Sequence, residues 1–203
     1  MSKRYDQYCP MAHALDLVGE RWSLLVLREL MHGPKRYTDL AEGLPGIGTN
    51  ILAARLRDLE RCGVIAKRTL PPPAASRVYE LTDYGRELRG VMRELALWGA
   101  RSLGPPTDED ELFPGWLANA IDIVLGPIAP PGRFVFRVGD EVASLVDGVG
   151  QPGAVDDPDV VVEGDPQMLY HMFVDRRLEL AKVEGDRELL ERLVAVAPVP
   201  AYT

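Results

Sequence analysis

The stretch YTDLAEGLPGIGTNILAARLRDLERCGVIAKRTLPPPAASR, residues 37–77, decides the fold of this chain. Its pattern predicts a short helix, a turn, a second helix over residues 48–61, a strand and a proline-rich hairpin tip. Leu52, Leu56 and Leu59 recur at i, i+4 and i+7, so we expect them to face a core. The opposite face carries an amide and two guanidiniums, which can read base edges in a major groove. The alternative is an ordinary surface helix with solvated arginines.

The sequence on either side of this stretch completes a recognisable order of elements. The front half is expected to contain helices over about 10–18, 21–30, 37–42, 48–61 and 83–103, and strands over 64–70 and 77–81. A helix-turn-helix followed by a two-stranded hairpin and a long closing helix is a winged helix-turn-helix. The long closing helix has more apolar residues than one small domain needs, which favours a second copy as its partner.

Short motifs along the front half resemble those of one family. They are Cys9-Pro10, Gly19-Glu20-Arg21-Trp22, Arg36-Tyr37-Thr38-Asp39-Leu40, Leu44-Pro45-Gly46-Ile47, Arg55-Leu56-Arg57-Asp58-Leu59-Glu60, Val78-Tyr79-Glu80-Leu81-Thr82 and Trp98-Gly99. On these motifs, residues 9–99 resemble the HxlR-type bacterial transcription regulators. The order Val78-Tyr79-Glu80 departs from the usual Val-Glu-Tyr, so details of the wing transfer less directly.

The resemblance implies a homodimer on a pseudo-palindromic DNA operator, with an interface built from the first and last helices of the DNA-binding domain. Leu15, Leu95 and Trp98 are the candidate dimerisation residues. Two-fold symmetry would set two recognition helices about one DNA turn apart.

Polar and small residues of the helix-turn-helix and wing are the candidate contacts to double-stranded DNA. They are Lys35, Arg36, Thr49, Asn50, Ala53, Ala54, Arg57, Arg68 and Arg77, with Lys67 beside them. We expect Asn50 and Arg57 to contact bases or phosphate, and the alanines to allow close approach. The basic residues outside this helix should reach phosphate or the minor groove. Each of these residues can instead be merely solvated.

The cysteines and histidines are the candidate reactive or metal-binding groups of the chain. Cys9 stands at a helix start, a position that favours a thiolate, and some relatives of the resembled family use a cysteine here as a redox sensor. The alternative is a small apolar cap at the dimer interface, and Cys62 is expected to be structural. The histidines are too scattered for a metal site. No catalytic motif is present, so we expect no enzyme, no metal and no cofactor.

Charge and composition divide the chain in two. The net charge is −8, yet residues 1–104 carry 16 Lys and Arg against 12 Asp and Glu, a net of +4. Residues 105–203 carry 7 against 19, a net of −12. A basic front half can meet DNA, whereas an acidic rear half should avoid it. Two cysteines, no secretory signal and no membrane-spanning run favour a cytoplasmic protein.

The rear half begins after a linker over residues 105–113, and residues 114–203 read as an α+β domain. The hairpin RFVFRVGDEVASLVDG, the segment DPDVVVEGDPQMLYHMFVDR and KVEGDRELLERL resemble the sterol-carrier-protein-2-like fold. That resemblance implies an apolar tunnel for lipid-like ligands. Its candidate lining is Trp116, Phe134, Met168, Leu169, Met172 and Phe173, which can equally be a filled core.

The sequence therefore predicts an α+β chain with a winged helix-turn-helix domain over residues 1–104 and a sterol-carrier-like domain over residues 114–203. The expected function is a dimeric, sequence-specific DNA-binding regulator, most simply a repressor, whose rear domain senses a small apolar ligand. Two alternatives stay open: a structural rear domain with a thiol switch at Cys9, and a carrier of hydrophobic molecules. The sequence names neither an operator nor a ligand.

Overall fold

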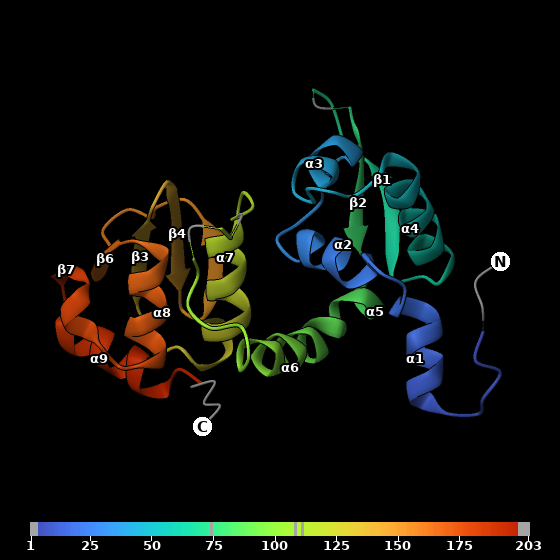
Figure 1. Ribbon diagram of the computed structural model, residues 1–203. Coiled ribbons are helices and arrows are strands. Elements are labelled where there is room, and N and C mark those ends of the chain that lie inside the picture. Colours follow the sequence, from blue (N-terminus) through green and yellow to red (C-terminus); the bar gives the residue numbers. More distant parts are fainter. Residues whose placement is uncertain (1–3, 74, 108, 111, 199–203) are drawn as a thin grey trace. The chain divides into compact units, whose positions relative to one another are not determined.

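The computed structural model describes residues 4–198, with the exception of 74, 108 and 111. The chain forms two compact units, Met1–Met92 and Arg93–Thr203, each with its own core. The division falls inside helix α6 (Leu88–Ala100), ahead of the domain boundary that the sequence predicts after residue 104. Figure 1 shows the elements of both units.

The first unit is a winged helix-turn-helix. Its elements are α1 (Pro10–Val18), α2 (Ser23–Leu30), α3 (Tyr37–Glu42), α4 (Thr49–Arg61), β1 (Ile65–Thr69), β2 (Arg77–Leu81) and α5 (Asp83–Arg86), followed by the start of α6. The antiparallel hairpin of β1 and β2 is the wing, and Lys35 bridges to Tyr79 at its side. The predicted elements are present, and α4 and β2 match their expected ranges to within one residue.

The long closing helix differs from the expectation, because it is broken at Glu87 into α5 and α6. Thr82 caps α5, and its Oγ1 accepts a hydrogen bond from the Gly85 amide at 3.0 Å. A Cβ at Gly85 would overlap the carbonyl oxygen of Val64, so only glycine lets this turn lie against the start of the wing. The helix therefore has a short docked segment and a longer free one.

The second unit is a five-stranded sheet packed against helices. The strands are β3 (Arg133–Val138), β4 (Glu141–Val146), β5 (Val149–Pro152), β6 (Val160–Gly164) and β7 (Lys182–Gly185), in the order β5-β4-β3-β6-β7. Only β3 and β6 pair in parallel; the other neighbours are antiparallel. The helical segments are α7 (Trp116–Ala120), the π-helical turn η1 (Ile121–Leu125), η2 (Gly126–Ile128), α8 (Pro166–Val174), η3 (Leu178–Leu180) and α9 (Arg187–Val196).

Two features of this unit add to what the sequence indicated. Asp147 and Gly148 end β4 in a two-residue hairpin turn with positive φ at both positions, which leads into the unpredicted strand β5. Helix α7 starts at Trp116 and widens into the π-helical turn η1. The buried Asp122 of that turn accepts a hydrogen bond from the Gly150 amide of β5 at 3.1 Å, a contact made 28 residues away.

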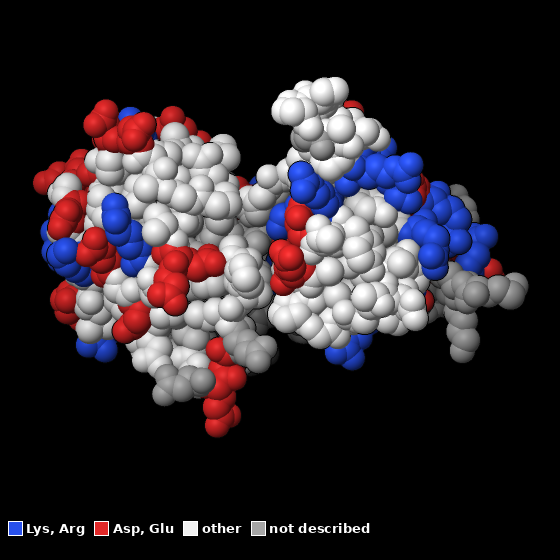
Figure 2. All heavy atoms as spheres, turned by 90° about the horizontal axis from the view of Figure 1, so that it is seen from above, with Lys and Arg blue, Asp and Glu red and all other residues white. Residues whose placement is uncertain are grey.

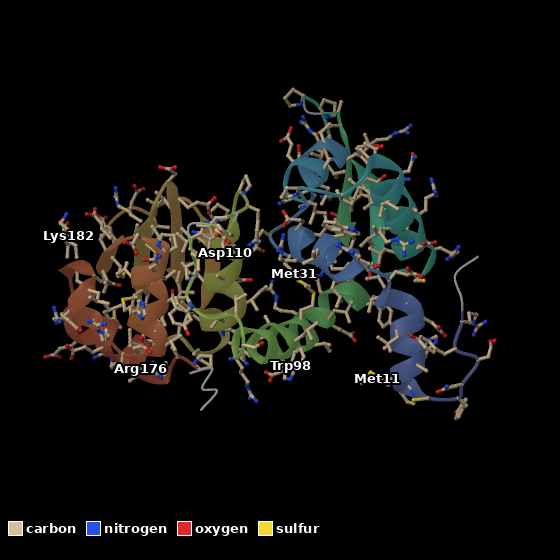
Figure 3. All side chains as sticks on the ribbon, in the orientation of Figure 1. Met11, Met31, Trp98, Asp110, Arg176 and Lys182 are labelled. Carbon is tan, nitrogen blue, oxygen red and sulfur yellow. The ribbon has the colours of Figure 1, made fainter. Side chains whose placement is uncertain are left out.

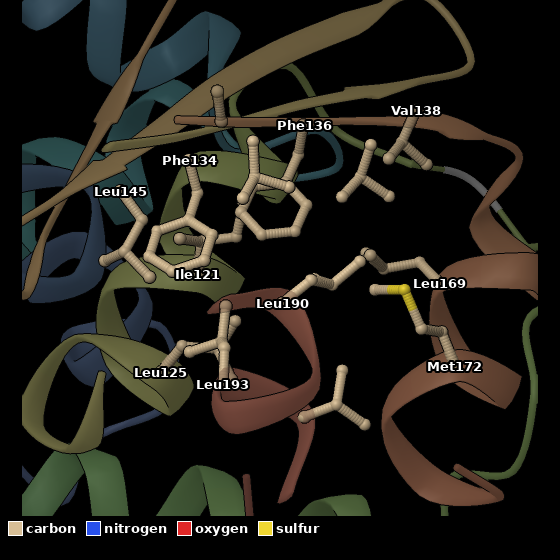
Figure 4. Close-up of a cluster of buried hydrophobic side chains, with 14 of the residues drawn as sticks. Ile121, Leu125, Phe134, Phe136, Val138, Leu145, Leu169, Met172, Leu190 and Leu193 are labelled. Atoms are coloured by element: carbon tan, nitrogen blue, oxygen red, sulfur yellow. The ribbon is translucent and has the colours of Figure 1, made fainter. Parts of the chain in front are cut away.

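The core of the second unit is filled (Figure 4). Phe134 and Phe136 of β3 are both fully buried and stack with ring centroids 6.4 Å apart. Residues of α7, α8 and α9 close over them, among them Met172 and Leu190, which have no exposed surface. Within the described residues, no helix is long and apolar enough to cross a bilayer.

Candidate nucleic-acid interface

Helix α4 turns one face inward and one face to solvent, as its leucine spacing predicts. Leu52, Leu56 and Leu59 are each at most 1 % exposed in the first core. On the other side Thr49, Asn50 and Arg57 are exposed, and Ala53 and Ala54 are half-buried. The outer face therefore offers an amide and a guanidinium above a shallow alanine floor, a shape that fits the floor of a major groove.

Helices α3 and α4 are held at their N-terminal ends. The Tyr37 hydroxyl donates a hydrogen bond to the carbonyl oxygen of Thr49 at 2.8 Å. The Asp39 carboxylate accepts one from the Arg36 amide, also at 2.8 Å, which fixes the first turn of α3. The two helices of the motif thus start from a common anchored point, so the outer face of α4 has a defined orientation in this unit.

The exposed cations of this region differ in whether a carboxylate already holds them. Arg61 is paired with Asp58 at 2.9 Å, Arg68 with Glu80 at 3.1 Å, and Lys67 with Glu60 at 3.3 Å. Among the described residues, no carboxylate pairs with the side chains of Arg36, Arg57 or Arg77, all three of which are exposed. These three guanidiniums are the ones available to phosphate without breaking an existing ion pair.

Lys67 lies on the outer face of the wing. The hydrogen bond to the Glu60 carboxylate raises the pKa of Lys67 above its usual value, and the neighbouring Tyr79 adds to the effect. Its ammonium lies 5.3 Å from the centre of the Tyr79 ring. Lys67 therefore ties the C-terminal end of α4 to the wing.

Lys35 has a structural partner that the sequence did not reveal. Its ammonium lies 2.7 Å from Oε2 of Glu29, whose side chain has no exposed surface. Arg28 holds the other oxygen of that carboxylate at 2.9 Å. A buried carboxylate is stable only when cations neutralise its charge. Lys35 can therefore bind phosphate only through the N–H donors that its ion pair with Glu29 does not use.

A second ion pair that the sequence did not reveal links α4 to the segment before α2. Arg55 on α4 lies 3.3 Å from Glu20 and 3.5 Å from Asp58. Trp22 follows Glu20 with a positive φ of 78° and precedes α2. The Gly19-Glu20-Arg21-Trp22 motif is thus part of the scaffold of α4. The motif was visible in the sequence, but its partner Arg55 was not.

Figure 2 shows Lys and Arg side chains gathered over the first unit on the face that carries the wing, and Asp and Glu scattered over the second. This distribution follows the charge difference between the two halves of the sequence. A basic face around α4 and the wing attracts polyphosphate.

The predicted dimerisation residues are solvent-exposed. Leu15 is 42 % exposed on α1, and Leu95 and Trp98 are 47 % and 69 % exposed on α6. Figure 3 labels Trp98 on α6 and Met11 on α1. Cys9 and Cys62 are both free thiols and half-buried. Across the described ranges, no three potential ligands come together as a metal site.

The six predicted ligand-lining residues fall into two groups. Phe134, Met168 and Met172 belong to the filled core (Figure 4). Trp116, Leu169 and Phe173 line a hollow of about 380 Å³ that borders this core, and Leu169 belongs to the core as well. Three of the six candidates thus line the hollow, and the other three are buried beside it.

Comparisons with known proteins account for the front half. A family model described as HxlR-like helix-turn-helix matches residues 17–106. The HTH-type transcriptional regulator YodB of Bacillus subtilis is 36 % identical over 98 residues, which cover 48 % of this chain and 88 % of YodB. The chain belongs to the HxlR-like helix-turn-helix family.

Two further matches cover the same part of the chain. An uncharacterized HTH-type transcriptional regulator of Synechocystis is 38 % identical over 107 residues, 53 % of this chain and 79 % of that protein. The solved structure of the reduced form of YodB from B. subtilis is 33 % identical and covers 50 % of this chain and all of that one, with a TM-score of 0.43. Members of this family are transcriptional regulators and not enzymes, so the front half is that of a DNA-binding regulator.

Proposed function

We propose that this HxlR-like protein is a homodimeric, sequence-specific repressor that acts in the cytoplasm, and that its rear unit senses a small apolar ligand. The observation that carries DNA reading is the outer face of α4. There Asn50 and the unpaired Arg57 stand exposed over two half-buried alanines. Base contacts come from Asn50 and Arg57, and phosphate contacts from Arg36, Arg77 and the partly committed Lys35, while Arg68 stays paired with Glu80.

Exposed apolar side chains support the dimer. Val91, Leu95 and Trp98 follow one another at i, i+4 and i+7 on α6 and are 62 %, 47 % and 69 % exposed. On α1, Met11 and Leu15 are spaced i, i+4 and are 69 % and 42 % exposed. Stripes of this kind on two helices are costly in water and are what an isologous helix interface buries.

The test compares two arginines of the same helix. Arg57→Ala removes an unpaired guanidinium, whereas Arg61→Ala removes one that is already bound to Asp58. Fluorescence anisotropy with the DNA upstream of the protein's own gene should show a loss of at least about 1 kcal/mol of binding free energy for Arg57→Ala. Arg61→Ala should lose less than half of that. Equal losses would contradict the assignment of Arg57 to the groove.

Strong dependence of binding on salt concentration would separate a regulator from a carrier of hydrophobic molecules, which has no reason to bind DNA. A thiol switch at the half-buried Cys9 is the alternative source of regulation. It would make DNA binding sensitive to diamide in the wild type but not in Cys9→Ser.

A further inference from the structure

The hollow of the second unit lies between four segments of the chain and has a volume of about 380 Å³. Its lining comes from the last turns of α6, residues 103–106, 110 and 112, the α7 and η1 helix, and α8, with Ala197 and Pro198 at its edge. It borders the core of Figure 4 and shares Ile121, Leu125 and Leu169 with that core. Clefts of about 300–1,000 Å³ are the usual size for small-molecule sites.

The walls of the hollow are apolar stripes on the helices of this unit. On α8 the stripe is Leu169, Tyr170 and Phe173, spaced i, i+1 and i+4. On the α7 and η1 side it includes Trp116 and Val124, both half-buried. Apolar surface of this extent that stays open in the folded chain indicates a ligand or partner.

The hollow is held open by polar contacts that lie at its edge. The Gln167 side-chain amide donates a hydrogen bond to the carbonyl oxygen of Pro106 at 3.2 Å, which fixes the linker to α8. Arg176 donates one to the carbonyl oxygen of Ala197 at 2.7 Å, which fixes the segment after α9. The site is therefore largely pre-formed, which lowers the ordering cost of binding.

The π-helical turn η1 is a second, independent mark of a functional site. Such turns are rare and are frequently found where a protein binds a ligand. Ile121, Val124 and Leu125 of this turn border the hollow, Ile121 and Leu125 from within the core, while Asp122 is anchored to Gly150 on the sheet. The widened turn thus places three apolar side chains in the wall and is fixed from behind.

Charge and polarity define the chemistry of the occupant. Among the described residues that line the hollow, the titratable ones are Tyr170 and Asp110. Asp110 accepts hydrogen bonds from the Thr107 amide and hydroxyl, and the backbone bond above all lowers the pKa of that carboxyl, so it is ionised. The unit as a whole is strongly acidic. None of the described lining residues is Lys or Arg, and Arg176 at the edge already donates to the carbonyl oxygen of Ala197, so a carboxylate or sulfonate ligand would lie in an apolar site without a lining cation to pair it.

Tyr170 supplies the polar group of the site. Its ring packs edge-on against His171 with centroids 5.4 Å apart, and its hydroxyl makes no hydrogen bond to the described residues. A cavity of about 150 Å³ accommodates benzene, so one of this volume takes a molecule of two or three rings. We propose that this hollow binds a compact, uncharged apolar molecule whose one polar group hydrogen-bonds to the Tyr170 hydroxyl.

The position of α6 links this site to the proposed dimer. At about 100° per residue, Leu97 and Ala100, which line the hollow, lie on the face of α6 opposite Leu95 and Trp98. A ligand that fixes Leu97 and Ala100 also fixes the helix that carries the proposed dimer stripe. This regulatory meaning rests on the proposed function, whereas binding itself does not.

The experiment uses the full chain and two dyes with the same ring system. N-phenyl-1-naphthylamine is uncharged, and 1-anilinonaphthalene-8-sulfonate is its anionic counterpart. The uncharged dye should bind saturably at one per chain, and the sulfonate at least about tenfold more weakly because its charge has no partner in the site. Tighter binding of the sulfonate, or a co-purified fatty acid in native mass spectrometry, would overturn the uncharged class.

Variants locate the binding. Ala120→Phe fills the hollow and should weaken the uncharged dye at least about tenfold, while Ala154→Phe, the same change in an exposed loop, should leave it unaltered. If Ala120→Phe does not fold by circular dichroism, Tyr170→Phe decides, with an expected loss of about threefold to tenfold. Equal affinity in the wild type and the variants would place the dye elsewhere and refute the site.

Operator binding by the same samples separates the two proposals. A wild type that binds DNA but not the uncharged dye refutes this inference and leaves the regulator intact; the reverse result refutes the regulator alone. The saturating dye should shift the dimer dissociation constant about fivefold or more in sedimentation equilibrium. An unchanged constant would refute the coupling through α6.

Discussion

Arg77 on the wing provides a direct measure of how this protein meets DNA. It is the first residue of β2, exposed, and free of any carboxylate among the residues that the structure describes. Arg68 on the neighbouring strand is bound to Glu80 at 3.1 Å. If Arg77 neutralises a phosphate, Arg77→Ala should reduce the slope of log K against log salt by about 0.9 per protomer, or about 1.8 for a dimer.

The same reasoning gives a free energy. At 0.1 M salt, one such contact contributes about 0.9 of a log unit, or about 1.2 kcal/mol per protomer, and about 2.5 kcal/mol for the dimer. Fluorescence anisotropy titrations of the operator at salt concentrations between about 50 and 200 mM would measure both the slope and this free energy. Circular dichroism should be unchanged, because the Arg77 side chain makes no hydrogen bond or ion pair with the described residues of the wing.

The matched control is the double variant Arg68→Ala and Glu80→Ala, which removes an ion pair of the same hairpin without changing the net charge. Its slope should equal that of the wild type, because a paired guanidinium releases no counterion from DNA. A fall in slope as large as that of Arg77→Ala would show that Arg68 leaves Glu80 on binding. That result would refute the distinction between free and committed cations.

Three further changes test the scaffold and the dimer. Glu29→Gln leaves the charges around it without their buried partner and should lower the free energy of unfolding by about 3 kcal/mol in urea denaturation. Gly85→Ala should destabilise the first unit by at least about 1 kcal/mol, because the added methyl overlaps a backbone oxygen, whereas Gly90→Ala, in open space on α6, should be neutral or stabilising. Trp98→Ser should shift sedimentation from dimer to monomer while keeping the helical content, and a dimer of unchanged mass would remove α6 from the interface.

Local periodicity was sufficient to predict the DNA-binding half. The leucines of α4 repeat at helical spacing and are buried together in the structure. The two wing strands are bounded by turn-forming residues in the sequence, and β2 has the predicted range. These features depend on residues that are close in sequence, so the pattern alone fixes them.

Whether each basic side chain is already paired with a carboxylate could not be predicted, because that pairing depends on contacts made by the folded chain. The bond from Arg61 to Asp58 spans three residues of one helix and can be foreseen from spacing. Lys35 lies in the segment between α2 and α3 and is paired with Glu29 of α2, whose complete burial determines how strong this ion pair is. A list of basic residues in the motif therefore overstates the number that is free to bind phosphate.

The rear half shows the same limit for apolar residues. Met168 and Met172 lie one helical position from Leu169 and Phe173, and the sequence grouped the four as one lining. In the structure the two methionines are buried in the core, Phe173 lines the hollow, and Leu169 belongs to both. Amphipathic spacing identifies the stripes of a helix but not which stripe its neighbours cover.

Helix α6 is the element through which a signal in this protein would act. Met92 near its start is buried in the first core, Leu97 and Ala100 near its end line the hollow, and Leu95 and Trp98 between them are exposed. Helix α6 thus contributes side chains to three different environments. A ligand changes DNA affinity only if it binds the competent and incompetent dimers differently. A ligand in the proposed site would meet that condition if the two dimers differ in how they hold Leu97 and Ala100.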